Sequence, residues 1–333
     1  MKYLFYISLL VVFVGCYESD PVLSPLDSST VDLRISDNNN QAVYLKLENK
    51  QITNDSSEVK WHLKFENAPN DWLIYLNPLE NVVIHPTTIT NFNEVDSNFN
   101  LVGLEWITDA PNSTDIKSAI NEWGDFAFDS PKSFKNVIIV RVKDGLTASF
   151  YKMQMLDANQ SGYRVRYGTL NGKYDHTILI KKDNSYTHSY LRLAENPVAP
   201  LAEPKRVDWD VCFTYIADSI SKHGVYPHLN TVNPFFGVYH AITINQEFAE
   251  VAIERSVAWA DIDYFLARKL TYARSDQISN EFVFWNDTIQ QAELVPNVTV
   301  ILKINSAYYK MKGRDLFGEF PSNFALRLAL QKL

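Results

Sequence analysis

The feature that most constrains the fold of this chain is an internal repeat, because four kinds of landmark occur twice in the same order. They are a Tyr-Leu segment, a Val-x-Trp-x-x-x-Phe segment, an Asn-Pro pair followed by a histidine, and a Tyr-Lys-Met segment. The partners, first copy before second, are Tyr44 and Tyr190, Trp61 and Trp209, Asn77 and Asn233, His85 and His240, and Met153 and Met311. This order predicts a tandem duplication of one structural unit.

The residue pattern inside each copy is that of β-strands. In 298–304, the side chains of Val298, Val300, Leu302 and Ile304 share one face, while Thr299 and Lys303 lie on the other. Such alternation is typical of a half-buried strand. Aromatic residues, which favour sheets, make up 13% of the chain. The sequence therefore predicts strands throughout both copies.

Signals for turns and helices are fewer. Asp144-Gly145 and Asn305-Ser306 follow matched strands, so each predicts a hairpin turn. The better candidates for short helices are 114–122 and 260–270. Three prolines predict a long loop inside the second copy, at Pro197, Pro200 and Pro204.

These patterns together predict an all-β fold with minor helix, built as two tandem antiparallel sandwich-like β domains. We place the first domain at 31–180 and the second at 186–333, with the link between the copies around 172–188. Two domains also agree with the length of the chain, which exceeds the usual size of one domain.

The start of the chain predicts export and lipid attachment. An apolar run from Leu4 to Val14 is too short to cross a bilayer as a helix, so 1–15 is predicted to be a signal peptide. Phe13-Val14-Gly15-Cys16 resembles the lipobox of bacterial lipoproteins, in which the cysteine is diacylated. The alternative is an ordinary cleaved signal followed by a chance cysteine. Residues 16–30, rich in Ser, Asp and Pro, are predicted to form a flexible tether from lipidated Cys16.

Charge and cysteine content exclude several other functions. The net charge of −8, without a long basic run, argues against nucleic-acid binding and against electrostatic docking on anionic lipid. Once Cys16 carries lipid, Cys212 is the only thiol left, so no intramolecular disulfide can form. The predicted membrane contact is therefore made through the N-terminal lipid.

The order of the landmarks resembles the HmuY-like haem-binding lipoproteins of Gram-negative anaerobes. The closest match to that family is the segment Trp209-Asp210-Val211-Cys212-Phe213, followed by a hairpin from Asn297 to Lys310. Trp123 or Trp285 corresponds to the later tryptophan of the family. The resemblance covers both copies and implies the fold, haem as the ligand, and an outer-membrane nutrient receptor of the TonB-dependent type as a partner.

The usual haem ligands of that family are not retained here. The resemblance implies two axial His or Met side chains on either side of the later tryptophan. No histidine or methionine occurs between Asn91 and Met153, or between Ala241 and Met311. Haem, if bound, must therefore find its ligands elsewhere in the chain.

Four histidines are candidate haem or metal ligands. His85 and His240 stand at matched places in the repeat, although both copies would also inherit a histidine that merely packs at a strand end. His223 and His228 lie with Tyr226 in a loop that is longer in the second copy, where binding residues often collect. The alternative is that these two are ordinary solvated loop histidines. Met153 and Met311 are predicted to be core residues.

No enzyme motif is present in the sequence, neither a nucleophile elbow, a His-Glu-x-x-His pair nor a phosphate loop. We therefore expect a non-enzymatic lipoprotein of the outer membrane, on its periplasmic or cell-surface face, that captures a small ligand such as haem for uptake. The alternative is a haem-free interaction or structural lipoprotein that binds a protein or glycan partner.

Overall fold

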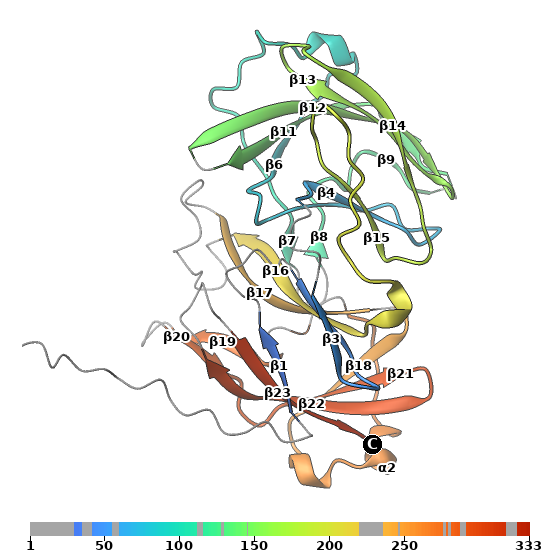
Figure 1. The fold of residues 1–333 in the computed structure, drawn as a ribbon, viewed down its shortest axis with the longest axis vertical. Coiled ribbons are helices and arrows are strands. Elements are labelled where there is room, and N and C mark those ends of the chain that lie inside the picture. Colours follow the sequence, from blue (N-terminus) through green and yellow to red (C-terminus); the bar gives the residue numbers. More distant parts are fainter. Residues whose placement is uncertain are drawn as a thin grey trace, which may run out of the picture.

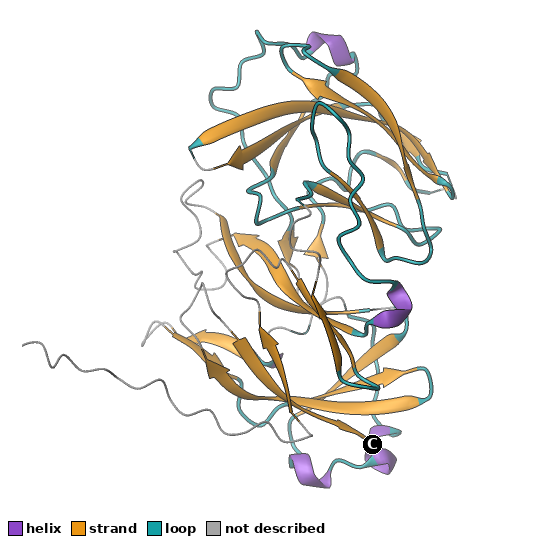
Figure 2. Ribbon diagram, in the orientation of Figure 1, coloured by secondary structure: helices purple, strands orange, loops and turns teal. Residues whose placement is uncertain are grey.

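The computed structural model describes residues 30–34, 42–54, 60–111, 116–127, 130–144, 146–219, 236–245, 247–275, 278, 281–286, 291–317 and 325–333. Over these residues the fold consists of antiparallel β-sheets joined by loops and a few short helical turns (Figure 2). The predicted all-β class with minor helix is therefore confirmed.

Two five-stranded sheets have matching strand orders, β14-β13-β12-β11-β6 and β1-β23-β22-β21-β18 (Figure 1). The strands of the first are β6 (Val83–Pro86), β11 (Val137–Asp144), β12 (Thr147–Asn159), β13 (Gly162–Thr169) and β14 (Asp175–Lys181). Those of the second are β1 (Thr30–Arg34), β18 (Ala249–Glu254), β21 (Thr299–Ile304), β22 (Ala307–Phe317) and β23 (Ala325–Lys332). The two Tyr-Lys-Met segments lie in β12 and β22, so the repeated segments hold matching places.

A smaller sheet packs against each five-stranded sheet and completes a sandwich. The first has the order β15-β4-β5, with β4 (Leu63–Glu66), β5 (Ile74–Leu76) and β15 (His188–Leu191). The second has the order β17-β16-β2-β3, with β2 (Ala42–Lys46), β3 (Gln51–Asn54), β16 (Val211–Ser219) and β17 (Phe236–Ile244). We call residues 60–204 the first unit, and residues 30–54 together with 205–333 the second unit.

This strand pairing crosses the domain boundaries expected at 31–180 and 186–333. Strand β2 pairs with β16, with Leu45 opposite Val211, and β1 pairs with β23. In return, β15 pairs with β4, with Leu191 opposite Leu63. Each predicted copy thus gives its first strands to the other unit. The order of landmarks could not reveal this exchange, because tandem repeats look the same along the sequence whichever neighbour a terminal strand joins.

Two separate hydrophobic cores follow the sheets rather than the expected boundaries. The core of the first unit contains only residues between Leu63 and Leu193. The core of the second unit joins Val31, Leu45 and Leu47 to residues from Val211 onward. Burial of apolar side chains therefore fixes the N-terminal strands in the second unit.

The two units repeat the same contacts around their landmark residues. Trp61 packs edge-on against Tyr190 with ring centroids 5.2 Å apart, and Trp209 packs against Tyr44 at 5.3 Å. Asn77 is buried and donates from Nδ2 to the carbonyl of Trp61 at 2.9 Å. The corresponding contact to Trp209 is made by Asn245, at 3.2 Å.

A second contact that occurs in both units is made by a buried lysine on the five-stranded sheet. Lys152 donates to the carbonyls of Phe92 and Val95, at 3.1 and 2.8 Å. Lys310 donates to those of Trp259 and Ile262, at 2.6 and 2.8 Å. Each lysine therefore holds one short 3-10 helix against its five-stranded sheet, η1 (Phe92–Glu94) in the first unit and η4 (Trp259–Asp261) in the second.

The remaining elements are short. They comprise the strand pairs β7 (Ala110–Pro111) and β8 (Ile116–Lys117), β9 (Gly124–Asp125) and β10 (Lys132–Ser133), β19 (Val283–Asn286) and β20 (Gln291–Leu294), together with η2 (Arg206–Asp208) and α2 (Tyr264–Ala267). No helix in the described ranges is long and apolar enough to span a membrane.

Several local predictions can be compared with these elements. The hairpin turns are confirmed, since Asp144 pairs with Thr147 and Ile304 with Ala307. Of the expected helices, 260–270 contains only one turn, and 114–122 contains β8 instead of a helix in its described part. The link expected at 172–188 is partly occupied by β14. The predicted proline loop does occur, and it is this loop that connects β15 to η2.

Candidate ligand-binding groove

A groove of about 670 Å³ lies where the two units meet. This volume falls within the range typical of small-molecule sites. The wall from the first unit contains residues in β4, β5, the loop between them and the start of β15. The wall from the second unit contains residues from η2 to Trp209, the end of β17, and 274–275. The lining side chains with charged or aromatic groups are Lys64, Glu66, Asp71, Trp72, Tyr75, Phe126, His188, Arg206, Trp209, Glu247 and Arg274.

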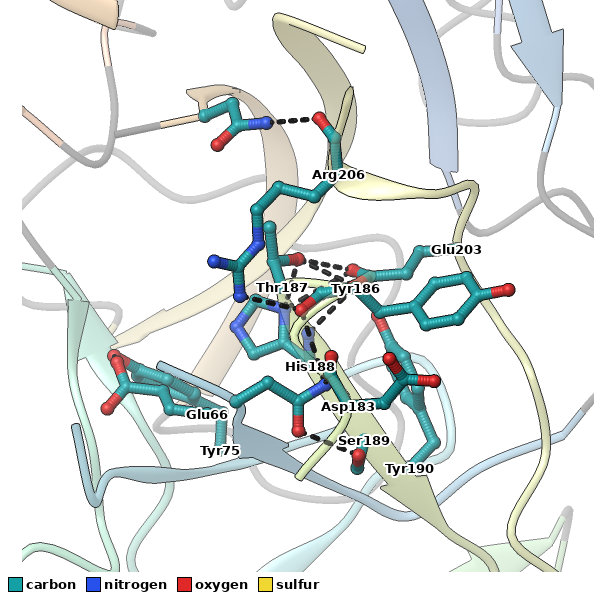
Figure 3. Close-up of polar contacts among 12 residues, drawn as sticks. Glu66, Tyr75, Asp183, Tyr186, Thr187, His188, Ser189, Tyr190, Glu203 and Arg206 are labelled. Atoms are coloured by element: carbon teal, nitrogen blue, oxygen red, sulfur yellow. Dashed lines mark hydrogen bonds and ion pairs between the residues drawn. The ribbon is translucent and has the colours of Figure 1, made fainter. Parts of the chain in front are cut away.

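His188, at the start of β15, is the one imidazole among the described residues that line this groove. Its Nδ1 lies 2.9 Å from Thr187 Oγ1 and 3.3 Å from Glu203 Oε2. The Thr187 hydroxyl donates to the same carboxylate, and so does the phenol of Tyr190, at 2.9 Å. Figure 3 shows the imidazole between Glu203 on one side and Glu66 and Tyr75 on the other.

The protonation of this pair follows from its surroundings. Burial lowers the pKa of the His188 imidazole and nearby Lys64 lowers it further, which together outweigh the rise caused by Glu203, so the neutral ring is favoured at pH 7. Burial alone would raise the pKa of Glu203, but the hydrogen bonds from His188 and Thr187 outweigh it and hold that pKa below its usual value. A carboxylate only accepts hydrogen bonds, so the ring proton sits on Nδ1 and Nε2 keeps its lone pair.

This arrangement is the one that prepares an imidazole to act as a ligand. Histidines that bind metals commonly donate their second ring nitrogen to a carboxylate, which fixes the tautomer and raises the basicity of the ring. The side chain of His188 is 21% exposed, whereas that of Glu203 is 2% exposed. The carboxylate is thus a buried support, and the imidazole is the group of the pair that a ligand can reach.

Arg206 joins the two units beside this pair. Its Nη2 donates to the carbonyl of Tyr186 in the first unit, at 2.7 Å, and its Nη1 forms an ion pair with Glu247 in the second. The carbonyl of Arg206 accepts from Asn245 Nδ2 at 2.8 Å. These contacts brace the groove at the point where the chain passes from one unit to the other.

Two buried donors on the lining residues have no hydrogen-bond partner among the described residues, Arg206 Nε and Trp209 Nε1. Both atoms are shielded from solvent, so neither faces the open space of the groove.

A second supported carboxylate lies beside His188 on the same sheet, where Glu66 is its cross-strand partner. Glu66 in β4 accepts from the backbone nitrogen of Leu73 at 2.9 Å and from the hydroxyl of Tyr75 at 3.1 Å. The ammonium of Lys64 lies 5.0 Å from the centre of the Tyr75 ring. The ring of Tyr75 in turn meets that of His188 edge-on, with centroids 6.1 Å apart. The groove therefore combines an imidazole, aromatic surface and charges of both signs.

The predicted site residues do not gather in this groove. Cys16, His223 and His228 lie outside the described residues, as do Asn233 and Tyr226. The backbone of His240 lies in β17 opposite Tyr215, but its side chain is outside the described part. The sequence paired Asn77 of the first copy with Asn233 of the second. In the structure, the asparagine that contacts Trp209 as Asn77 contacts Trp61 is Asn245.

His85 lies on β6, where it is paired with Ile139 of β11. Its Nδ1 is 2.9 Å from the carbonyl of Glu105, and its ring contacts Trp106 at 6.3 Å. Since β6 matches β18 in strand order and His240 lies on β17, the expected equivalence of these two histidines is wrong. Met153 and Met311 are both fully buried core residues, as predicted.

Sequence reasoning missed His188 and Glu203. No short motif contains both, since His188 lies in β15 and Glu203 in the proline loop that follows it, and His188 falls at the end of the segment expected to link the copies. Within the described residues no group of three or more His, Cys, Asp or Glu side chains is placed to hold a metal ion. The groove therefore offers one supported imidazole rather than a complete metal site.

Comparison with family models, with curated proteins and with solved structures found no match to this chain in any of the three.

Proposed function

We propose that this protein is a non-enzymatic lipoprotein of the outer membrane that captures a small ligand in the groove between its two units. The observation that supports the proposal is the neutral His188 imidazole, backed by Glu203 and exposed in a groove of about 670 Å³. The attachment to the membrane rests on the lipobox-like sequence at Cys16.

Haem is the first ligand to test, because the residues in the groove fit it. An imidazole nitrogen with a lone pair is a common axial ligand of haem iron. Lys64 and Arg274 supply cations for carboxylate groups, and Trp72 and Phe126 supply aromatic surface. The described part of the lining contains one imidazole, so we expect one axial ligand from it. In the same proposal, a TonB-dependent receptor takes over the captured ligand.

The experiment is a haem titration of the purified full chain, followed by its Soret absorbance. Wild-type protein should bind with a stoichiometry near one, and His188→Ala should abolish or greatly weaken the binding. His85→Ala is the matched control and should bind as wild type does. The triple change of His223, His228 and His240 to Ala tests the alternative set of ligands predicted from the sequence.

Each result leads to a different conclusion. Loss of binding in the triple variant, with normal binding by His188→Ala, would place haem in the second unit and remove the groove from the proposal. Absence of haem binding in wild type would favour the rival function, a haem-free lipoprotein that binds a protein or glycan partner. The rival has its own support, since the groove holds equal numbers of cations and carboxylates, namely Lys64, Arg206 and Arg274 with Glu66, Asp71 and Glu247.

A further inference from the structure

The second unit ends in a cluster of aromatic side chains that is partly exposed. Tyr264 and Phe265, in α2, are 40% and 68% exposed, and their rings lie 5.9 Å apart. Tyr264 also contacts Tyr308 at 5.6 Å, and Trp259 of η4 is half-buried nearby in the chain. We call Trp259, Tyr264, Phe265 and Tyr308 the aromatic tip.

The aromatic tip is held rigidly by the core beneath it. Ile262 and Ala267 are buried against Ile301 of β21. The carboxylate of Asp263 accepts from the backbone nitrogen of Leu266 at 2.8 Å and caps α2. Lys310 fixes η4 by its bonds to the carbonyls of Trp259 and Ile262. The exposed rings are therefore not loose side chains on a mobile loop, and their exposure is a property of the fold.

The chain enters the second unit at the same end. Strand β1 is antiparallel to β23, with Thr30 opposite Ala329, so the N-terminal end of β1 lies at the end of β23 that leads to Leu333. Leu333 packs in the cluster of Ile262 and Ala267, and its backbone nitrogen donates to the carbonyl of Tyr308 at 2.9 Å. The aromatic tip and the entry of the tether therefore lie together.

We propose that the aromatic tip docks on the surface of the membrane to which Cys16 is anchored. This inference rests on the lipid anchor of the proposed function. The segment from Cys16 to Thr30 has 15 residues and reaches at most about 50 Å, so the anchor keeps this end of the second unit close to the bilayer. Tyrosine and tryptophan are enriched at membrane interfaces, where an apolar ring with a polar edge is well accommodated.

The charges around the aromatic tip indicate which kind of bilayer it fits. Arg268 and Lys269 are exposed beside it, as are Asp261 and Asp263, and the ammonium groups of Lys310 and Lys312 lie 4.7 and 5.3 Å from the centre of the Trp259 ring. Cations therefore outnumber carboxylates around the tip. The rings should dock on zwitterionic phospholipid, and anionic phospholipid should strengthen the docking in a way that salt screens.

The test uses the lipidated full chain bound to zwitterionic vesicles with and without brominated acyl chains, which quench nearby tryptophan. Wild-type emission should be quenched, and Trp259→Phe should remove most of the quenching. Phe265→Ser and Tyr264→Ser should each reduce it towards background, because loss of one inserted ring weakens docking by about tenfold. Leu146→Ser is the matched control, since Leu146 is fully exposed in the first unit, and it should change nothing.

Flotation of the same samples separates the two proposals. If wild type fails to float with the vesicles, the lipid anchor is wrong and docking falls with it. If wild type floats but Phe265→Ser is quenched as strongly as wild type, the anchor stands and the docking proposal is overturned. In that case the exposed rings remain as a surface for a protein partner. All variants change exposed or half-buried side chains, and thermal melting checks that they fold.

Discussion

Replacing Leu45 by Ala tests the strand exchange between the units. Leu45 is fully buried in the core of the second unit, although it lies near the start of the sequence. Truncation of a buried leucine costs about 2–5 kcal/mol, part of which comes from the cavity it leaves. A loss of only 2 kcal/mol raises the equilibrium constant for unfolding of the affected unit roughly 30-fold.

Hydrogen exchange measured by mass spectrometry can assign that loss to one unit. We expect faster exchange in β16 and β21–β23 of Leu45→Ala, with β11–β13 unchanged. Leu191→Ala should show the reverse, because Leu191 is buried in the core of the first unit. The control is Ile52→Ala, which removes a 42% exposed side chain paired with Leu45 and should have little effect. Faster exchange of β11–β13 in Leu45→Ala would refute the assignment of β2 to the second unit.

Two further predictions concern single buried groups. Burial, with Arg192 and Lys60 nearby, lowers the pKa of His62 to about 4, and its Nδ1 accepts from the backbone nitrogen of Leu193. Because the folded state favours the neutral ring, stability is fully present above about pH 6.5 and falls by about 3 kcal/mol as the pH drops towards 4. Urea unfolding at several pH values should show this fall in wild type and a smaller one in His62→Gln. The same dependence of the free energy of unfolding on pH in both proteins would contradict the prediction. Lys310→Met leaves two carbonyls without their donor, so chemical denaturation should show that the free energy of unfolding falls by about 2 kcal/mol. An unchanged denaturation midpoint would show that Lys310 does not support η4.

Much of the fold could be predicted from the sequence, because alternation of apolar residues determines strands locally. The hairpins at Asp144 and Asn305, the buried methionines and the proline loop were all accessible in this way. Asn305 adopts a positive φ of 54°, as expected of a tight turn residue. The partner of each strand was not accessible, since β2 and β15 contain similar Tyr-Leu segments that fit either unit.

The candidate groove could not be predicted for a related reason. Its residues come from both units, and they meet only because the chain crosses between the sheets near Arg206. His188 lies in β15 and Glu203 in the proline loop after it, and neither residue belongs to a recognisable motif. His85 and His240 were chosen because they hold similar places along the sequence. The role of His188 depends instead on its contact with Glu203, which only the folded chain creates.

The most direct test of the central claim is to locate the bound ligand. Hydrogen exchange of the full chain should be compared with and without haem at saturating concentration. We predict slower exchange in peptides that cover Thr187–Leu191 and Thr243–Asn245, with no change around His85. Protection confined to the second unit away from these segments, or none at all, would contradict a ligand site in the groove between the units.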